Sequence, residues 1–178
     1  LTADKPSTIP IAIPDAVPFG GNQTDRETMR QVDLYTSSII TEVSSVPFFQ
    51  VLERKQANEI YSEISYQLQT GGELSEAVLN TKLRGAGALL LTGFGELYGK
   101  IVITARLVDL QTGRILLATT TYSKPEEVLS AVKELAASIR EKGSELGKSV
   151  SLEDVRRAVK TRSWQEAKRL ADAYLPLG

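Results

Sequence analysis

Apolar residues recur at the spacing of an amphipathic helix in several stretches of the chain. The first predicted helix starts at a capping box, with Thr24 as N-cap and Glu27 reaching back, and ends near Pro47. Its apolar positions are Met29, Val32, Ile39, Ile40, Val43 and Val46. The second helix opens at Glu53 and stops at Gly71-Gly72. One face of it carries Ala57, Ile60, Tyr61, Ile64 and Leu68.

Further helices are predicted later in the chain. A short one runs from Ser75 to about Arg84, and another follows Ser123-Lys124-Pro125-Glu126, where Ser123 is the expected N-cap. The apolar stripe of that helix is Val128, Val132, Leu135 and Ile139, and it ends at Lys142-Gly143. The polar segment 141–149 is predicted to be a linker. Two short helices, Leu152–Lys160 and Trp164–Leu175, close the chain as a helical hairpin.

Strand patterns fill the intervals between these helices. Residues Thr8–Val17 form a predicted strand with one irregular side, because Pro10 and Pro14 have no N–H to donate, and the chain then breaks at Phe19–Asn22. A short strand, Phe48–Leu52, precedes the second helix. The clearest period of two belongs to three later strands, at Ala88–Leu97, Lys100–Leu110 and Arg114–Tyr122, which two short turns connect.

The predicted order is β-α-β-α-α-β-β-β-α, followed by the helical hairpin. Strands joined by short turns are antiparallel, whereas the initial β-α-β unit favours parallel pairing. The fold class is therefore α/β (α+β), with a mixed β-sheet and helices on its faces. Residues 1–143 are expected to form this domain, and 144–178 the linker and the hairpin. We expect the helices bearing Val32 and Val132 to cover the three later strands, which make up the middle of the sheet.

Composition removes several kinds of chemistry from this fold. The 178-residue chain has no His and no Cys, which excludes imidazole catalysis, thiol nucleophiles and the usual zinc ligands. A net charge of −1 does not favour binding to nucleic acid. No apolar run is long enough to span a bilayer as a helix, and no signal peptide is visible. Because the chain begins Leu-Thr-Ala, we expect a trimmed start that has lost any targeting segment.

The candidate motifs favour structural roles. The glycines at 85, 87, 93, 95 and 99 do not match a phosphate-binding loop, and glycines inside strands more often mark bulges or close packing of a helix. Asp15, Glu53 and Asp109 lie at strand ends, where paired carboxylates could catalyse hydrolysis or hold a metal ion. Capping and turn formation explain all three better. No Ser–Lys pair is singled out, so no catalytic, cofactor-binding or metal residue is predicted.

Three motifs together resemble the CsgG family of curli-assembly lipoproteins. They are FFQVLERKQANEI with its Glu53-Arg54 pair, GAGALLLTGFGEL with Gly93, and ARLVDLQTGRIL with Asp109, Thr112 and Gly113. The resemblance spans about Ile9–Lys142. It implies a non-catalytic periplasmic protein, associated with the outer membrane, that acts in assembly or secretion. Similar folds occur in the amino-terminal domain of TolB and in lipoprotein activators of penicillin-binding proteins.

The chain departs from the curli channel protein in two ways. The connections Leu97–Lys100 and Thr121–Pro125 are too short to contain the transmembrane pore hairpins of that family, so we expect no pore. The lipidated Cys expected at the mature start is absent, and the membrane would be reached only through a removed lipid anchor.

Three functions therefore stay open. The chain is a docking domain for other envelope proteins or copies of itself, an activator of a periplasmic cell-wall enzyme, or an enzyme with carboxylate or Ser/Lys chemistry. The main expectation is the first, without a cofactor. Trp164, Leu170 and Tyr174 of the terminal hairpin are candidate partner-binding residues, although Trp164 could equally be a packing plug. Deleting 149–178 is expected to leave the domain folded and to remove association, unless the hairpin belongs to the core.

Overall fold

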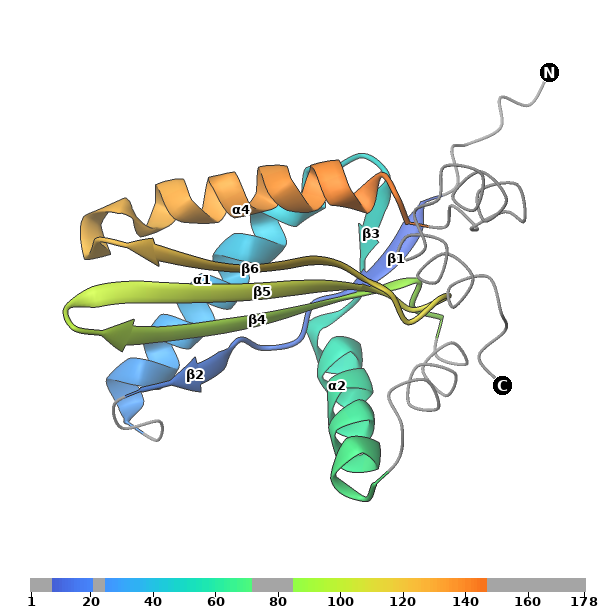
Figure 1. Ribbon diagram of the computed structural model, residues 1–178, viewed down its shortest axis with the longest axis horizontal. Helices are drawn as coiled ribbons and strands as arrows, with labels where there is room; N and C mark the ends of the chain where they lie inside the picture. Colours follow the sequence, from blue (N-terminus) through green and yellow to red (C-terminus); the bar gives the residue numbers. More distant parts are fainter. Residues whose placement is uncertain (1–7, 21–24, 72–84, 147–178) are drawn as a thin grey trace, which may run out of the picture.

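A computed structural model describes residues 8–20, 25–71 and 85–146 of the chain. Within these ranges, helices pack on both faces of one mixed β-sheet (Figure 1). The elements are β1 (Ile9–Ala12), β2 (Val17–Phe19), α1 (Arg26–Ser44), β3 (Phe49–Val51), α2 (Arg54–Gln69), β4 (Ala88–Leu97), β5 (Lys100–Asp109), β6 (Ile115–Ser123), the 3-10 helix η1 (Pro125–Glu127) and α4 (Val128–Gly143).

The sheet has six strands in the order β3-β1-β4-β5-β6, with β2 paired to β4 beyond the end of β1. Strand β1 is parallel to both β3 and β4, and β2 is also parallel to β4. The β4–β5 and β5–β6 pairs are antiparallel. This arrangement confirms the predicted fold class, with a parallel start and an antiparallel meander in one mixed sheet.

Two tight turns connect the antiparallel strands. Tyr98 and Gly99 link β4 to β5 with φ angles of 52° and 75°, the left-handed pair that a two-residue hairpin requires. At the other end, Asp109 accepts a 2.8 Å bond from the Gln111 N–H through its carboxylate, and its carbonyl accepts a 2.7 Å bond from Gly113. These bonds make Asp109 a turn former, as the sequence predicted.

The main core lies between the sheet and helices α1 and α4. Ile39 of α1 and Ile139 of α4 are fully buried, as is Leu107 in the middle of β5. Val32, Val132 and Leu135 belong to the same cluster, so the predicted coverage of the three later strands is confirmed. The prediction that all three strands lie in the middle of the sheet is wrong for β6, which is an edge strand. In Figure 1, α1 passes behind the strands and α4 runs along β6.

Helix α2 packs on the opposite face, at one end of the sheet. Ala57, Ile60 and Ile64 of α2 form a second buried cluster with Leu89 of β4 and Val108 of β5. No helix among the described elements contributes to this face farther along β4 and β5, toward the Tyr98-Gly99 turn. The uneven coverage leaves a large part of that face open.

Several local predictions about the helix ends were wrong. Helix α1 has Asp25 as its N-cap, and the Glu27 carboxylate accepts bonds from Arg30 instead of reaching back. Thr24 lies outside the described residues. Met29 is 53% exposed, because its position in the first turn extends beyond the sheet that buries later turns. The Ser123 hydroxyl donates to its neighbour's carbonyl, and a turn of 3-10 helix starts α4.

The amino-terminal strand divides into two pieces, which the sequence did not predict. After β1 the ladder is replaced by side-chain acceptors: the Asp15 N–H donates to Asn58 Oδ1 at 2.8 Å, and the Ala16 N–H donates to Thr36 Oγ1 at 3.0 Å. The chain then rejoins the sheet as β2, so Phe19 is a strand residue and not part of a break. Helix α4 ends at Gly143, as predicted, and Leu146, within the segment 141–149 predicted to be a linker, is buried in the core.

Candidate docking face

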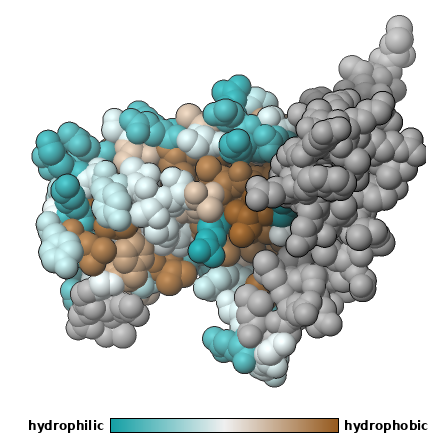
Figure 2. Space-filling model, in the orientation of Figure 1, coloured by the Kyte–Doolittle hydropathy of each residue, from teal (hydrophilic) through white to brown (hydrophobic). Residues whose placement is uncertain are grey.

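The open face of the sheet carries three cross-strand rows of side chains on β4, β5 and β6. The rows are Leu91–Arg106–Ala118, Gly93–Thr104–Thr120 and Gly95–Val102–Tyr122. They share a face because every second residue of a strand points to the same side. Figure 2 shows this side of the molecule, where apolar surface gathers over the middle of the sheet between polar margins.

Two glycines shape this face by admitting an aromatic ring. Phe19 of β2 lies beside Gly95, and a Cβ at Gly95 would stand 2.2 Å from the Phe19 carbonyl oxygen and 2.6 Å from its ring. A Cβ at Gly93 would stand 2.4 Å from Thr104 Oγ1. Both distances are too short for any side chain. The absence of side chains at these glycines therefore lets β2 and its ring lie against the sheet, so the close packing involves a strand and not the helix that the sequence favoured.

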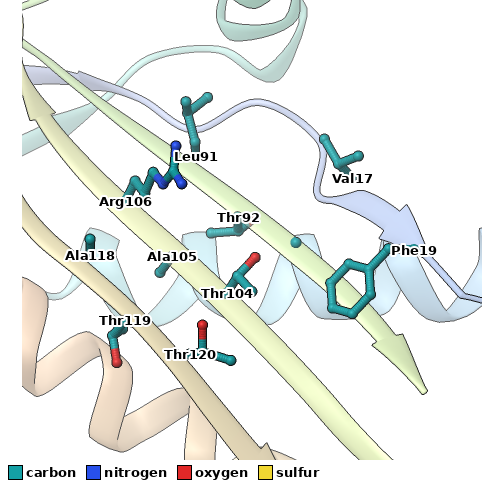
Figure 3. A pocket seen from close by; sticks show the side chains of 11 residues that line it. Val17, Phe19, Leu91, Thr92, Thr104, Ala105, Arg106, Ala118, Thr119 and Thr120 are labelled. Atoms are coloured by element: carbon teal, nitrogen blue, oxygen red, sulfur yellow. The ribbon is translucent and has the colours of Figure 1, made fainter. Parts of the chain in front are cut away.

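The Phe19 ring, the glycines and the neighbouring rows enclose a shallow hollow of about 450 Å³ (Figure 3). Its lining residues are Val17, Phe19, Leu91, Thr92, Gly93, Thr104, Ala105, Arg106, Ala118, Thr119 and Thr120. The Arg106 side chain lies next to Leu91 at one end, and Phe19 lies at the other. Apolar groups thus surround a short polar stretch formed by Thr104 and Thr120.

Arg106 is the one ionisable side chain in this lining. It is exposed, and none of the salt bridges among the described residues involves it. A guanidinium presents a planar fork of donors that matches a carboxylate. General acid–base catalysis requires a proton donor or acceptor that titrates near the working pH, which arginine does not supply. The lining residues are therefore suited to binding an apolar group with a carboxylate beside it.

The three carboxylates considered for catalysis have separate structural contacts. Asp15 binds the Arg54 guanidinium, whose Nη2 also lies 2.6 Å from Asp33 Oδ1. The hydrogen bond that Arg54 donates to Asp15 is the main cause that raises the pKa of Arg54. Arg54 thus connects the loop after β1 to α1 and to the start of α2, which explains the Glu53-Arg54 pair in structural terms. The Glu53 carbonyl accepts the first bond of α2, from the Ala57 N–H at 2.9 Å.

Asp109 is 2% exposed and forms the turn between β5 and β6. Its contacts are therefore with its own turn, not with the other two carboxylates. Across residues 8–20, 25–71 and 85–146, no group of three acidic side chains is placed to hold a metal ion. Among the helices of these ranges, none has the length and apolarity to cross a membrane.

The predicted partner-binding residues Trp164, Leu170 and Tyr174 lie outside the described residues. The docking face itself was not predicted from the sequence. One signal was present, since Val102, Thr104, Arg106 and Val108 alternate with the buried residues of β5. Which of them is exposed depends on tertiary packing, since Val102 and Val108 are buried and Arg106 is exposed. Phe19 was assigned to a break. The hollow thus follows from tertiary contacts that the pattern alone does not specify.

Comparison with known proteins supports the fold. No protein-family model matches the sequence, and no curated protein matches it either. Among solved structures, TolB from Acinetobacter baumannii is similar over 82% of this chain, with a TM-score of 0.50 and 12% identity. The match covers 30% of TolB, so the chain spans less than a third of that protein. At this identity the likeness concerns the fold alone.

Two further structures match with lower scores. The C-terminal domain of LpoB from Salmonella enterica has a TM-score of 0.37 and 13% identity, covering 69% of this chain and 86% of that one. Lipoprotein GNA1162 from Neisseria meningitidis has a TM-score of 0.44 and 16% identity, covering 74% and 97%. The fold is thus similar to that in TolB, one of the proteins that the sequence resemblance brought in. These structures do not single out the curli-secretion family.

Proposed function

We propose that this chain is a non-catalytic docking domain of the bacterial cell envelope, which binds a partner protein through the open face of its sheet. The observation that carries the proposal is the hollow between Phe19 and Arg106, with its apolar walls and single exposed charge. The partner inserts an apolar side chain beside Phe19 and pairs a carboxylate with Arg106. Full burial of one such side chain contributes about 1.5–3 kcal/mol.

The envelope location is the second part of the proposal. It is supported by the sequence resemblance to curli-assembly lipoproteins and by the fold shared with TolB. Within the envelope, the docked partner is either a component of surface-structure assembly or a periplasmic cell-wall enzyme that the domain activates. These two finer functions use the same face and differ in the partner, so the identity of the captured protein distinguishes them.

The test is capture of the partner from envelope extract by the wild-type chain and two variants. Arg106→Glu reverses the charge in the hollow, so the affinity should fall at least about tenfold, which corresponds to ~1.4 kcal/mol. Leu34→Glu, at an apolar position of α1 that is 56% exposed, is the matched control and should bind like the wild type. Equal capture by all three proteins would contradict docking at the hollow.

A further inference from the structure

The outer edge of β6 is a second candidate binding surface, because its outward backbone N–H and C=O groups pair with no other described strand. Strand β6 pairs only with β5 among the described strands, and its nine residues, ILLATTTYS, contain neither proline nor charge. The strands at the other edges are protected differently, since β3 has three residues and β2 contains Pro18. Long edge strands without proline or charge are templates for pairing with another chain.

The register identifies which backbone groups of β6 point outward. In a two-residue hairpin the residues flanking the turn are hydrogen-bonded, so Lys100 and every second residue of β5 bond to β4. The remaining residues of β5 bond to β6, in agreement with the 2.9 Å bond from the Asp109 N–H to the Arg114 carbonyl. The β5 residues that bond to β4 each lie opposite one residue of β6. These β6 residues do not bond to β5, so their N–H and C=O groups point away from the sheet. They are Ala118, Thr120 and Tyr122.

A groove next to this edge defines the chemistry of an incoming strand. It has a volume of about 280 Å³ and lies between residues 121–123 and the start of α4. Its charged lining residues are Glu127 and Glu134. On the open face of the sheet, the last outward-bonding residue is Tyr122, whose side chain is 64% exposed. Because side chains of a strand alternate between faces, one side of an added strand meets carboxylates and the other meets an aromatic ring.

We propose that β6 accepts an extended peptide segment of a partner protein, in which basic and apolar residues alternate. The outward N–H and C=O groups of Ala118, Thr120 and Tyr122 bind its backbone, as in other cases of strand addition. Its basic side chains enter the groove beside Glu127 and Glu134, and its apolar side chains pack beside Tyr122. This inference rests on the proposed docking function and assigns the backbone edge of β6, which adjoins the hollow because Ala118 and Thr120 also line it.

The probe is a synthetic heptapeptide of alternating lysine and valine, added to the full chain. When the peptide saturates the protein, amide hydrogen exchange at Thr120 and Tyr122 should slow by at least about tenfold. Thr120→Pro removes one outward N–H and should abolish this protection, whereas Thr120→Val keeps the N–H and should retain it. A variant with both Glu127→Gln and Glu134→Gln keeps the backbone groups of the edge and should weaken binding by about tenfold at low salt.

Several results would overturn the inference. These are absence of peptide binding, binding that leaves exchange in β6 unchanged, and equal binding by the double glutamine variant at low salt. Concentration-dependent self-association that Thr120→Pro removes would show that a second copy occupies the edge instead. Arg106→Gln alters the hollow and should bind the peptide like the wild type. If the peptide does not bind at β6 but the hollow still captures its partner, this inference is wrong and the proposed function stands.

Discussion

Single buried residues explain much of the stability of this domain. Leu107 lies in the middle of β5 and is fully buried between the sheet and the covering helices. Replacement by alanine removes packed atoms and leaves a cavity, which costs ~2–5 kcal/mol. Urea unfolding of Leu107→Ala should show this loss, while Leu129→Ala, at a position 68% exposed, should change stability by less than about 0.5 kcal/mol. Equal effects would contradict the assigned core.

Because of Tyr35, the free energy of unfolding is expected to depend on pH in the alkaline range. Its ring stacks on Phe94 at a centroid distance of 5.2 Å, and its buried hydroxyl has no hydrogen-bond partner among the described residues. Burial raises the pKa of Tyr35, because the charged phenolate is desolvated. In the unfolded chain a tyrosine releases its proton near pH ~10, so the free energy of unfolding falls as pH rises above that value.

The variant Tyr35→Phe should remove this dependence. At pH 7 it should be as stable as the wild type or slightly more stable, since phenylalanine leaves no unsatisfied hydroxyl. At about pH 10.5 its advantage should grow by about 1 kcal/mol, because only the wild type gains from ionisation on unfolding. Denaturant unfolding of both proteins at the two pH values measures the difference. A constant difference would show that the hydroxyl is solvated.

At the scale of elements, packing overrides local preference at Gly143. This residue is the last of α4, where alanine is intrinsically favoured by about 1 kcal/mol. A Cβ there would lie 2.6 Å from Cζ of Phe49. Gly143→Ala should therefore destabilise the protein, since overpacking costs about 1–3 kcal/mol and exceeds the gain in helix propensity. Thermal unfolding of both variants measures this. Ser130→Ala, at an exposed position of the same helix, should be neutral or slightly stabilising.

The success of sequence-based prediction differs between elements for physical reasons. The turn of the β4–β5 hairpin and the bounds of β4 were predicted to the residue, because period-two alternation and Tyr98-Gly99 specify them locally, and β5 ends one residue before the predicted Leu110. The division between β1 and β2 was not predicted, since it depends on distant acceptors such as Thr36 and Asn58. The hollow was missed for the same reason. Gly93 and Gly95 indicated close packing, but the ring that fills this space comes from Phe19, far away in the sequence.

At the scale of the whole molecule, the uneven coverage of the sheet supports the proposed docking function. Helices α1 and α4 bury one face, whereas α2 covers only one end of the other. The carboxylates Asp15 and Asp109 have structural partners, and the hollow contains a single arginine as its ionisable group. This arrangement supports the proposal that the domain binds another protein through the open face of its sheet.

A consequence is that the purified chain should turn over neither nucleotides, peptides nor glycosides, and should retain no transition metal after dialysis. Asp15→Asn and Asp109→Asn should change stability and not create or remove an activity. Standard hydrolysis assays and metal analysis measure this. Robust turnover that one of these substitutions abolishes, or stoichiometric zinc, would assign the carboxylates a catalytic or metal-binding role.

Site-specific photo-crosslinking tests the docking face most directly. A photoreactive residue replaces exposed Ala118 at the rim of the hollow, and in a separate protein it replaces Leu34 on α1. In intact cells that produce the full chain, position 118 should crosslink one partner protein, and adding Arg106→Glu should remove that product. Position 34 should give no such product. Equal crosslinking from both positions, or a product from position 118 that persists with Arg106→Glu, would contradict a partner held at the hollow.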